Sequence, residues 1–294
     1  MSESLLTWIV FTPLIGAAAV LLTGRWPNLR EAVSLITGGV LIAQVTQLIS
    51  PVLAGETPSV LLAVPVPRVP LALQAEPLGL LFALIAAVLW VATTVYAIGY
   101  MRGHGEKHQT RFFAFFAIAI SATMGVALAQ NLFTLFLFYE LLTLSTYPLV
   151  THAGTDQARR GGRVYLGILM GTSMGFLLLA VIWTWQLAGT TAFHPGGILA
   201  DKGSPVVVGV LYALFAFGIG KAALMPFHRW LPAAMVAPTP VSALLHAVAV
   251  VKAGVFAILE ITVYVFGLDL LSVTGATTPI LWVAAITIIG ASLV

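Results

Sequence analysis

The chain contains a series of apolar runs, each long enough to cross a lipid bilayer. A membrane-spanning helix needs about 20 predominantly apolar residues. Of the 294 residues, 60% are hydrophobic and 8% are charged, whereas a soluble domain carries about 25% charged residues. A soluble core could not absorb so much apolar sequence. The sequence therefore predicts an all-α polytopic membrane protein.

We expect about nine transmembrane helices, with a tight turn at Gln130–Asn131 between the fourth and fifth. Their ranges are 4–23, 32–52, 74–100, 112–130, 131–152, 164–188, 206–225, 239–267 and 278–294. The segment ETPSVLLAVPVPRVPLAL is rich in proline and partly alternating, which predicts an extended or hairpin-like exposed loop. Residues 1–70 would then form an N-terminal transmembrane hairpin with an external loop, and residues 71–294 a core.

The basic residues of the predicted loops are distributed unequally. Lysine and arginine accumulate in the cytoplasmic loops of membrane proteins. With the N-terminus outside, only Arg68 and Lys202 lie on the outer side. The cytoplasmic side then carries Arg25, Arg30, Arg102, Lys107, Arg111, Arg159, Arg160, Arg163 and Arg229. We therefore predict a multi-pass protein with its N-terminus outside.

Several classes of function have no support in the sequence. There are no cysteines, so the chain has no thiolate ligand for an iron–sulfur cluster. The net charge of +3 is spread over short loops rather than gathered in one patch, so we expect no nucleic-acid partner. The loop GHGEKHQ, residues 103–109, is interpreted as a solvated basic loop rather than a metal site. We expect no cofactor and no metal.

Three charged residues fall inside the predicted spans: Glu140, Lys221 and Lys252. A carboxyl group near the bilayer centre costs roughly 2.5 to 3.5 kcal/mol on insertion scales. Such residues normally face the bundle interior, pair with one another and mark ion or proton pathways. The alternative for any one of them is a structural ion pair between two helices. Three in one chain favour a functional role.

The sequence around Lys221 predicts an interrupted helix. Gly218 and Gly220 precede the lysine, and Pro226 follows it. Proline removes a helical hydrogen bond and clashes with the preceding turn, so we expect the helix to break shortly after Lys221. Broken helices are tolerated at membrane depth where they line a cavity, and they build ion sites in transporters. An ordinary proline kink is the alternative.

Two histidines lie near these lysines. His246 is six residues before Lys252 in the same predicted helix, where both a proton relay and simple packing remain open. His228 is adjacent to Arg229 near the predicted cytoplasmic boundary, which favours a structural or proton-access role. Burial disfavours the charged form of a lysine or a glutamate, whereas mutual attraction favours it. Moving a nearby charge could switch such a pair between ionised and neutral forms.

Two segments carry a resemblance to a known family. NLFTLFLFYELLTLSTYPLV and GKAALMPFHRWLPAAMVAPTPVSALLHAVAVVKAG resemble the proton-conducting antiporter-like subunits. Mrp-type Na⁺/H⁺ antiporters, the membrane arm of respiratory complex I and membrane-bound hydrogenases share these subunits. The similarity covers roughly residues 70 to 294.

The resemblance implies roles for individual residues. Glu140 matches the glutamate of the fifth core helix, and Lys221 the lysine of the broken seventh helix that pairs with it. Lys252 and His246 match the lysine and histidine of the eighth helix, and His228 the histidine before the WLP element. The family usually has an acidic residue at the position of Ala233.

The resemblance also implies a fold of two inverted repeats. Residues 71–294 would supply the first repeat, with the second missing or truncated at Val294. Close relatives commonly have an arginine at the position of Glu260.

The leading hypothesis is a proton-translocating subunit of a multisubunit Mrp-type cation/H⁺ antiporter in a bacterial or archaeal cytoplasmic membrane. Its partners would be other membrane subunits, the lipid bilayer, protons, and Na⁺ or K⁺. We expect a transporter subunit rather than a stand-alone enzyme. The alternatives are a subunit of a complex I-type or hydrogenase-type redox-driven pump, and a non-conducting scaffold subunit.

Overall fold

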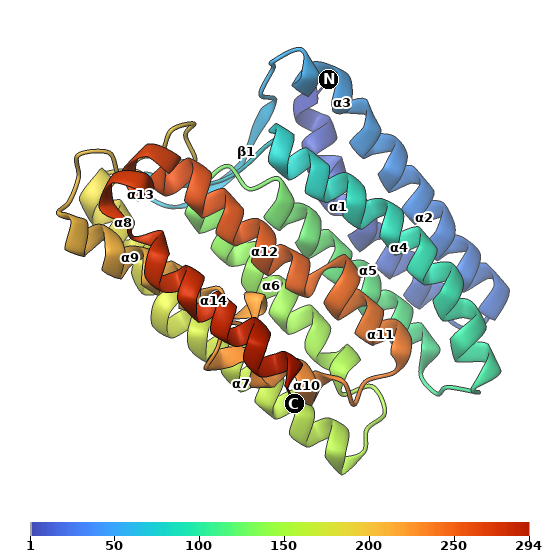
Figure 1. The fold of residues 1–294 in the computed structure, drawn as a ribbon. Coiled ribbons are helices and arrows are strands. Elements are labelled where there is room, and N and C mark those ends of the chain that lie inside the picture. The colour runs from blue at the N-terminus through green and yellow to red at the C-terminus, as the bar shows by residue number, and fades with distance from the viewer. Residues whose placement is uncertain (1, 294) are drawn as a thin grey trace.

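The protein is a bundle of long helices with one short β-hairpin at one end, seen in a computed structural model that describes residues 2–293 (Figure 1). The elements are α1 (Ser2–Leu22), α2 (Pro27–Gln47), α3 (Ile49–Leu53), β1 (Ser59–Val66), β2 (Val69–Gln74), α4 (Pro77–Gly103), α5 (Gln109–Ala127), α6 (Leu132–Val150), α7 (Asp156–Thr172), η1 (Ser173–Leu177), α8 (Leu178–Ala188), α9 (Pro205–Gly218), η2 (Gly220–Ala222), η3 (Phe227–Arg229), α10 (Trp230–Ala234), α11 (Thr239–Ala243), η4 (Leu244–Val248), α12 (Val250–Ile261), η5 (Thr262–Phe266), α13 (Leu268–Thr274) and α14 (Thr277–Ser292). Here η1, η4 and η5 are π-helical turns, and η2 and η3 are 3₁₀ turns.

Seven helices within residues 2–293 are long and apolar enough to span a membrane, which confirms a polytopic all-α membrane protein. An eighth span results if α13 and α14, which meet at a bend of 89°, are counted as one. Two of the expected spans are shorter in the structure. The run 206–225 yields only the 14-residue α9 before the helix stops. The run 278–294 yields α14, and its last residue, Val294, lies outside the described residues.

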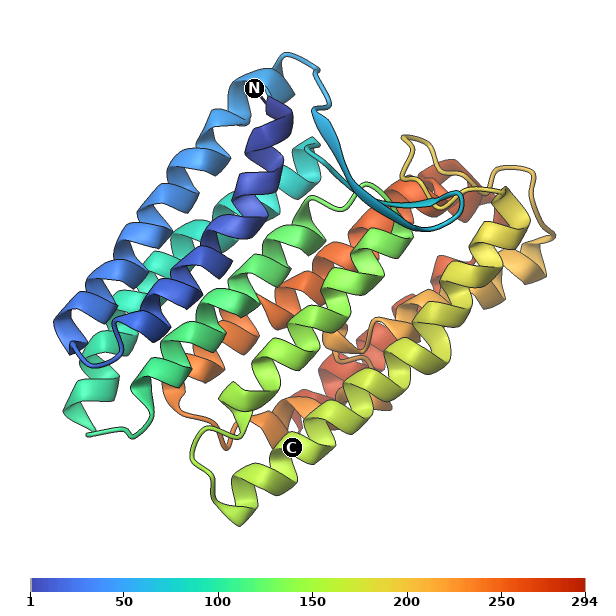
Figure 2. The same cartoon turned by 180° about the vertical axis from the view of Figure 1, so that it is seen from behind.

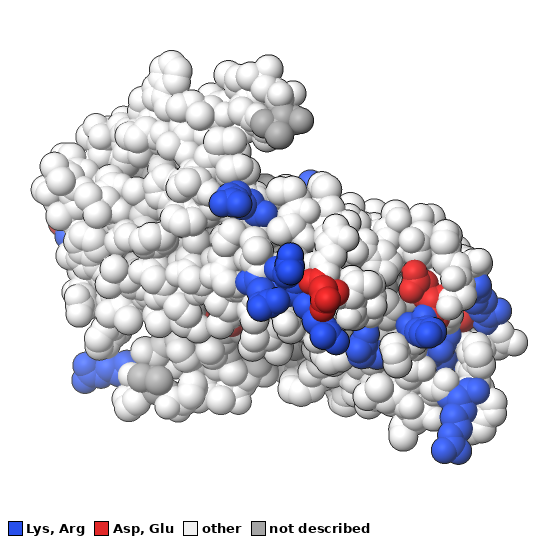
Figure 3. Space-filling view, turned by 90° about the horizontal axis from the view of Figure 1, so that it is seen from below, with Lys and Arg blue, Asp and Glu red and all other residues white. Residues whose placement is uncertain are grey.

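The helices run alternately between the two ends of the bundle, so the connections sort into two groups (Figures 1 and 2). The N-terminus and the β-hairpin lie at one end. The connections after α1, α4 and α6 lie at the other end. These connections hold or adjoin Arg25, Lys107 and Arg159, so the basic loops share one end of the bundle. Viewed from below, Lys and Arg side chains form distinct groups on an otherwise largely uncharged surface (Figure 3).

The proline-rich loop forms the expected hairpin and packs onto the turn between α5 and α6. Strands β1 and β2 are antiparallel. The Ala72 N–H donates to Thr134 Oγ1 (3.0 Å), and Asn131 Nδ2 donates to the Pro70 carbonyl oxygen (2.9 Å). Asn131 also caps α6 by accepting the Thr134 N–H (2.9 Å). One asparagine therefore fixes both the hairpin and the start of the helix that carries Glu140.

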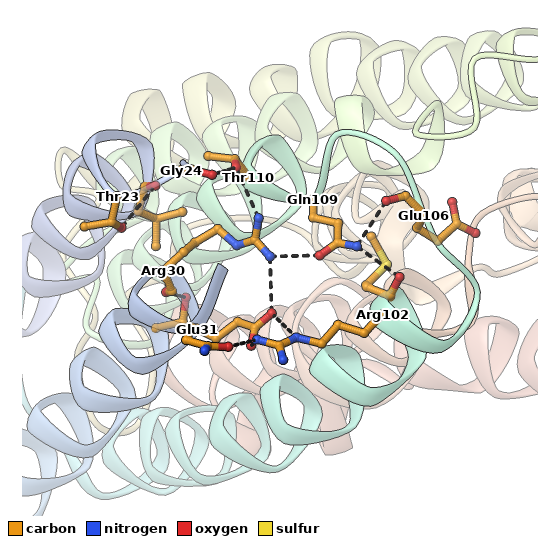
Figure 4. A network of polar contacts seen from close by, with 12 residues as sticks. Thr23, Gly24, Arg30, Glu31, Arg102, Glu106, Gln109 and Thr110 are labelled. Atoms are coloured by element: carbon orange, nitrogen blue, oxygen red, sulfur yellow. Dashed lines mark hydrogen bonds and ion pairs between the residues drawn. The ribbon is translucent and has the colours of Figure 1, made fainter. Parts of the chain in front are cut away.

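A partly buried ion network, in which Arg30 and Glu31 are buried and Arg102 is exposed, joins α2, α4 and the start of α5 at the basic end of the bundle (Figure 4). The guanidinium of Arg30 donates to Glu31 Oε1 (3.2 Å) and Gln109 Oε1 (2.8 Å). Arg102 donates from Nε to Glu31 Oε1 (2.9 Å) and makes a second contact with Glu31 Oε2. Arg30 and Glu31 are buried side by side. Because each charge has a charged or polar partner, the network holds three helices in register.

Candidate functional site

The helix that leads to Lys221 stops before the lysine. Helix α9 ends at Gly218, and Ile219 leaves the helical region with φ −80° and ψ 61°. We expected the break after Lys221, so the prediction of a broken helix is right but its position is wrong. The reason is a close approach of the backbone. A Cβ atom on Gly218 would lie 2.4 Å from the Leu177 nitrogen, and one on Gly220 2.3 Å from Thr172 Oγ1.

The released segment buries Lys221 completely and places its ammonium group against α6. Its Nζ donates to Thr143 Oγ1 (2.6 Å) and to the Tyr139 carbonyl oxygen (2.8 Å). The same nitrogen lies 3.1 Å from the centroid of the Tyr139 ring, where the π-electrons attract a cation. The Lys221 backbone N–H donates to Tyr139 Oη (3.1 Å). Tyr139 and Thr143 therefore hold both ends of the lysine.

Glu140 lies on α6 between these two lysine partners. It is 7% exposed, and neither carboxylate oxygen has a hydrogen-bond partner among the described residues. The Ser173 side chain, at the start of η1, lies beside the carboxyl group, although its hydroxyl donates to the Met170 carbonyl oxygen (3.2 Å). Glu140 and Lys221 interact electrostatically but form no direct ion pair within residues 2–293.

A second layer of aromatic and small residues fixes the broken segment. Trp230 Nε1 donates to the Gly220 carbonyl oxygen (2.8 Å), which also accepts from the Ala223 N–H (3.0 Å). The Trp230 ring packs edge-on against Tyr165 at 5.6 Å, and the Tyr165 hydroxyl lies 2.6 Å from Thr146 Oγ1. Helix α12 presses on the other side, since a Cβ on Gly254 would lie 2.5 Å from the Ala222 nitrogen.

The remaining predicted site residues lie farther out. His246 sits in the π-turn η4, is half-buried and has a buried Nε2 without a partner among residues 2–293. Such π-turns occur frequently at functional sites. Lys252 is exposed on α12, contrary to the expectation that it faces the bundle interior. His228 is half-buried in η3, and its buried Nδ1 has no partner in the described part of the chain.

Sequence reasoning missed Tyr139 and Thr143, whose spacing of four residues places both on the face of α6 that meets Lys221. It also passed over a second buried carboxyl group. Glu260 is 1% exposed and has no hydrogen-bond partner for either oxygen among the described residues, while Glu76 and Tyr264 lie beside it. The signal for this group was the family resemblance, which implies an arginine at the position of Glu260.

Potential ligands for a metal ion are dispersed. Within residues 2–293, no group of three or more His, Asp or Glu residues is arranged to hold one. The site is thus a lysine and a carboxyl group buried together, with aromatic and hydroxyl neighbours.

The chain matches a known family over the segment that holds this site. Residues 129–294 match the profile of the family described as NADH:quinone oxidoreductase/Mrp antiporter, transmembrane. The chain belongs to this family. The matched range begins just before α6 and includes the broken segment and α12.

Individual relatives agree with this assignment. An antiporter subunit, mnhA2, of Staphylococcus epidermidis is 29% identical over 194 residues, which cover 65% of this chain and 24% of the relative. The mnhA2 subunit of Staphylococcus aureus strain JH9 is 29% identical over 192 residues, with the same coverage. The chain thus spans about a quarter of the length of these relatives.

Solved structures share the fold. A chain of the Mrp complex from Dietzia sp. DQ12-45-1b superposes with a TM-score of 0.72 at 27% identity, over 92% of this chain and 29% of that one. A chain of the membrane-bound sulfane sulfur reductase, an archaeal respiratory membrane complex, gives a TM-score of 0.73 at 23% identity. It covers 86% of this chain and 40% of that one. The chain is therefore an antiporter-like membrane subunit.

Proposed function

We propose that this antiporter-like subunit translocates protons within a multisubunit Mrp-type monovalent cation/H⁺ antiporter. Protons would be relayed along Glu140, Lys221, His246 and Lys252, with His228 near the cytoplasmic end of the path. The observation that carries the proposal is the burial of Lys221 at a helix break, beside a buried carboxyl group without hydrogen-bond donors.

The geometry supports a switchable charge rather than a fixed ion pair. Three α6 groups stabilise the ammonium form of Lys221: the Thr143 hydroxyl, the Tyr139 carbonyl and the Tyr139 ring. The Glu140 carboxylate has no comparable donors, so its charged form depends on the positive charge of Lys221. Moving the proton or the charge of one residue therefore changes the stability of the charged form of the other.

The outer members of the relay lie on η4 and on the following helix α12, which packs against the broken segment at Gly254. His246 occupies a π-turn, and Lys252 follows on the exposed face of the helix. A charged side chain facing lipid at membrane depth is unfavourable. We therefore propose that protein covers the Lys252 face of α12 in the assembled complex, so that Lys252 passes protons to or from that neighbour.

The fold and the relatives support the finer assignments. Mrp complexes and antiporter subunits are among the similar proteins, which favours membrane subunits as partners and Na⁺ or K⁺ as the exchanged cation. The gathering of basic loops at the end opposite the N-terminus favours a bacterial or archaeal cytoplasmic membrane location with the N-terminus outside. We assign residues 71–294 to an antiporter-like core that includes the first of two inverted repeats.

The test measures proton flux and complex assembly in the same vesicles. Glu140→Gln keeps the side-chain size and removes the ionisable group, and Lys221→Ala removes the ammonium group. Both variants should assemble, but their cation-driven proton flux should fall about tenfold or more. A tenfold fall corresponds to an increase of roughly 1.4 kcal/mol in the activation free energy of transport. Lys202→Ala, an exposed loop lysine, is the matched control and should retain normal flux.

Three outcomes distinguish the functions. Loss of flux with normal assembly supports the relay. Normal flux in both variants would overturn the relay and favour a scaffold subunit. Proton movement that requires a redox substrate and ignores cation gradients would instead assign the subunit to a redox-driven pump.

A further inference from the structure

A polar pocket of about 390 Å³ lies at the basic end of the bundle, apart from the relay residues. It is formed where α4 ends, α5 begins and α6 ends. The ionisable side chains that line it are His104, Glu106, Lys107, His108, Arg111 and His152. Lys107, His108 and Arg111 are exposed, so the pocket opens to the surface. The pocket contains most of the GHGEKHQ loop, together with His152, which follows the C-terminal end of α6.

His152 is the unusual member of this lining. Its residue is only 4% exposed, and both ring nitrogens are buried without a fully formed hydrogen bond among the described residues, although the Lys107 backbone lies beside the ring. The His152 ring packs edge-on against the Phe112 ring, with 5.9 Å between the ring centroids. The His152 backbone carbonyl oxygen accepts a hydrogen bond from Arg111 Nη2 (3.0 Å), so the residue is held in place. A buried polar group without a partner is unfavourable. A ligand that accepts a hydrogen bond from the ring in the pocket would remove this penalty.

The charge of the pocket favours an anion. Lys107 and Arg111 supply two positive charges against the single carboxylate of Glu106. The N-terminus of α5, at Gln109, adds the partial positive charge of a 19-residue helix. His104 donates from Nδ1 to the Tyr100 carbonyl oxygen (3.0 Å), so its other ring nitrogen donates to an anion only when the imidazole is protonated. Several donors and a net positive charge around one small cavity fit a phosphate group.

We propose that this pocket binds a phosphate group, and that the phosphate belongs to the headgroup of an acidic phospholipid. Basic pockets between transmembrane helices on the cytoplasmic side bind such headgroups. The pocket lies at the end of the bundle where the basic loops gather, at the level of the helix ends Gly103 and Val150. A bound headgroup would tie the α4–α5 loop to the end of α6, the helix that carries Glu140.

This inference is independent of the proposed proton transport, because no pocket residue belongs to the relay. Its test therefore measures binding rather than flux. The complex containing the full chain is purified in nanodiscs of phosphatidylcholine with a minor fraction of phosphatidylglycerol. Native mass spectrometry then counts retained phosphatidylglycerol, and a parallel titration measures binding of inorganic phosphate.

The variants separate the pocket from general surface charge. Lys107→Gln removes one exposed charge from the lining and should weaken phosphatidylglycerol retention about fivefold. His152→Phe keeps an aromatic ring against Phe112 and removes the donor, and should weaken retention about tenfold. Arg160→Gln is the matched control, since Arg160 is an exposed basic residue outside the pocket, and it should retain the lipid as the wild type does.

The outcomes are decisive in each arm. Selective loss of phosphatidylglycerol in Lys107→Gln and His152→Phe supports the lipid site. Binding of inorganic phosphate with the same variant pattern, without selective lipid retention, supports a phosphate site that serves a soluble anion and overturns the lipid source. Equal lipid retention in all three variants, with no binding of inorganic phosphate, overturns the proposal. Because Lys107 is exposed, its variant remains informative if His152→Phe fails to fold.

Discussion

The ammonium nitrogen of Lys221 lies 2.6 Å from Thr143 Oγ1, on the same helix as Glu140 and three residues beyond it. The lysine is therefore held by the helix of its proposed partner, although the two charged groups do not touch. This arrangement keeps the positive charge near the carboxyl group and leaves the carboxylate oxygens free of fixed donors. Either group can then change its charge without breaking a direct ion pair.

Thr143→Val tests this hydrogen bond. Valine keeps the shape of threonine but removes the hydroxyl that accepts from Lys221, and a hydrogen bond to a charged group contributes about 1.5 to 3 kcal/mol. We expect about a tenfold or larger fall in cation-driven proton flux per assembled complex, measured with a pH-sensitive dye in vesicles. Thr184→Val is the control, because the buried Thr184 hydroxyl has no partner among the described residues. Equal flux in both variants would contradict the role given to Thr143.

Gly254→Ala tests the contact between α12 and the broken segment. The added methyl group would lie 2.5 Å from the Ala222 nitrogen and 2.6 Å from the Lys221 carbonyl carbon, so the segment that carries the lysine must move. Overpacking of this kind costs about 1 to 3 kcal/mol. We expect a lower melting temperature and reduced proton flux.

The matched control for Gly254→Ala is Gly209→Ala in α9, where no atom lies within 4 Å of the new methyl group. Alanine is favoured over glycine in a helix by about 1 kcal/mol, so this variant should be as stable as the wild type or more stable. A normal melting temperature and normal flux in Gly254→Ala would show that the contact does not constrain Lys221.

Glu31→Gln tests the ion network at the basic end. Arg30 is buried and shares Glu31 with Arg102, so the substitution leaves a buried guanidinium without its carboxylate. Breaking a buried pair in this way costs about 3 to 5 kcal/mol. We expect a clear fall in the denaturation midpoint in detergent. Asp156→Asn, in an exposed pair with Arg159, should change it little. If the denaturation midpoint fell equally in Glu31→Gln and Asp156→Asn, the network around Glu31 would stabilise the protein no more than an exposed ion pair does.

His152 gives the stability a pH dependence. Burial, helped by the nearby Arg111 charge, lowers the pKa of the His152 imidazole below its ordinary value of 6.5, while Glu106 and the Lys107 backbone oppose the shift. His108 also lies nearby and lowers the pKa. The unfolded chain therefore binds a proton that the folded chain rejects. The stability that the folded state gains by keeping His152 neutral is fully present above about pH 6.5. It is lost as the pH falls through the pKa of His152 in the folded protein.

We therefore expect the melting temperature to fall as the pH is lowered from 7.5 to 5.5, and to fall less steeply in His152→Phe. The comparison is made in detergent at constant ionic strength. His104→Gln removes an exposed histidine of the same loop and should leave the slope as in the wild type. A slope that is unchanged in His152→Phe would assign the pH dependence to other groups.

The sequence determined the class of the protein because hydrophobic length is a local property. Apolar runs predicted the spanning helices, and proline with alternation predicted the β1–β2 hairpin. Charged residues in apolar sequence identified Glu140 and Lys221 without any structure, since burying a charge is too unfavourable to be accidental. The segments around them carried the resemblance that the match over residues 129–294 bears out.

The tertiary structure decided what depends on contacts between distant segments. The helix breaks before Lys221 rather than after it, where Gly218 and Gly220 approach η1 and α7. The two glycines indicated a break, but the sequence does not show which distant segments they approach. The partners of the lysine, Tyr139 and Thr143, lie about 80 residues away in sequence, at separations of 82 and 78. The pocket at His152 likewise joins three helix ends. Sequence specifies which groups are buried, whereas packing specifies which groups meet.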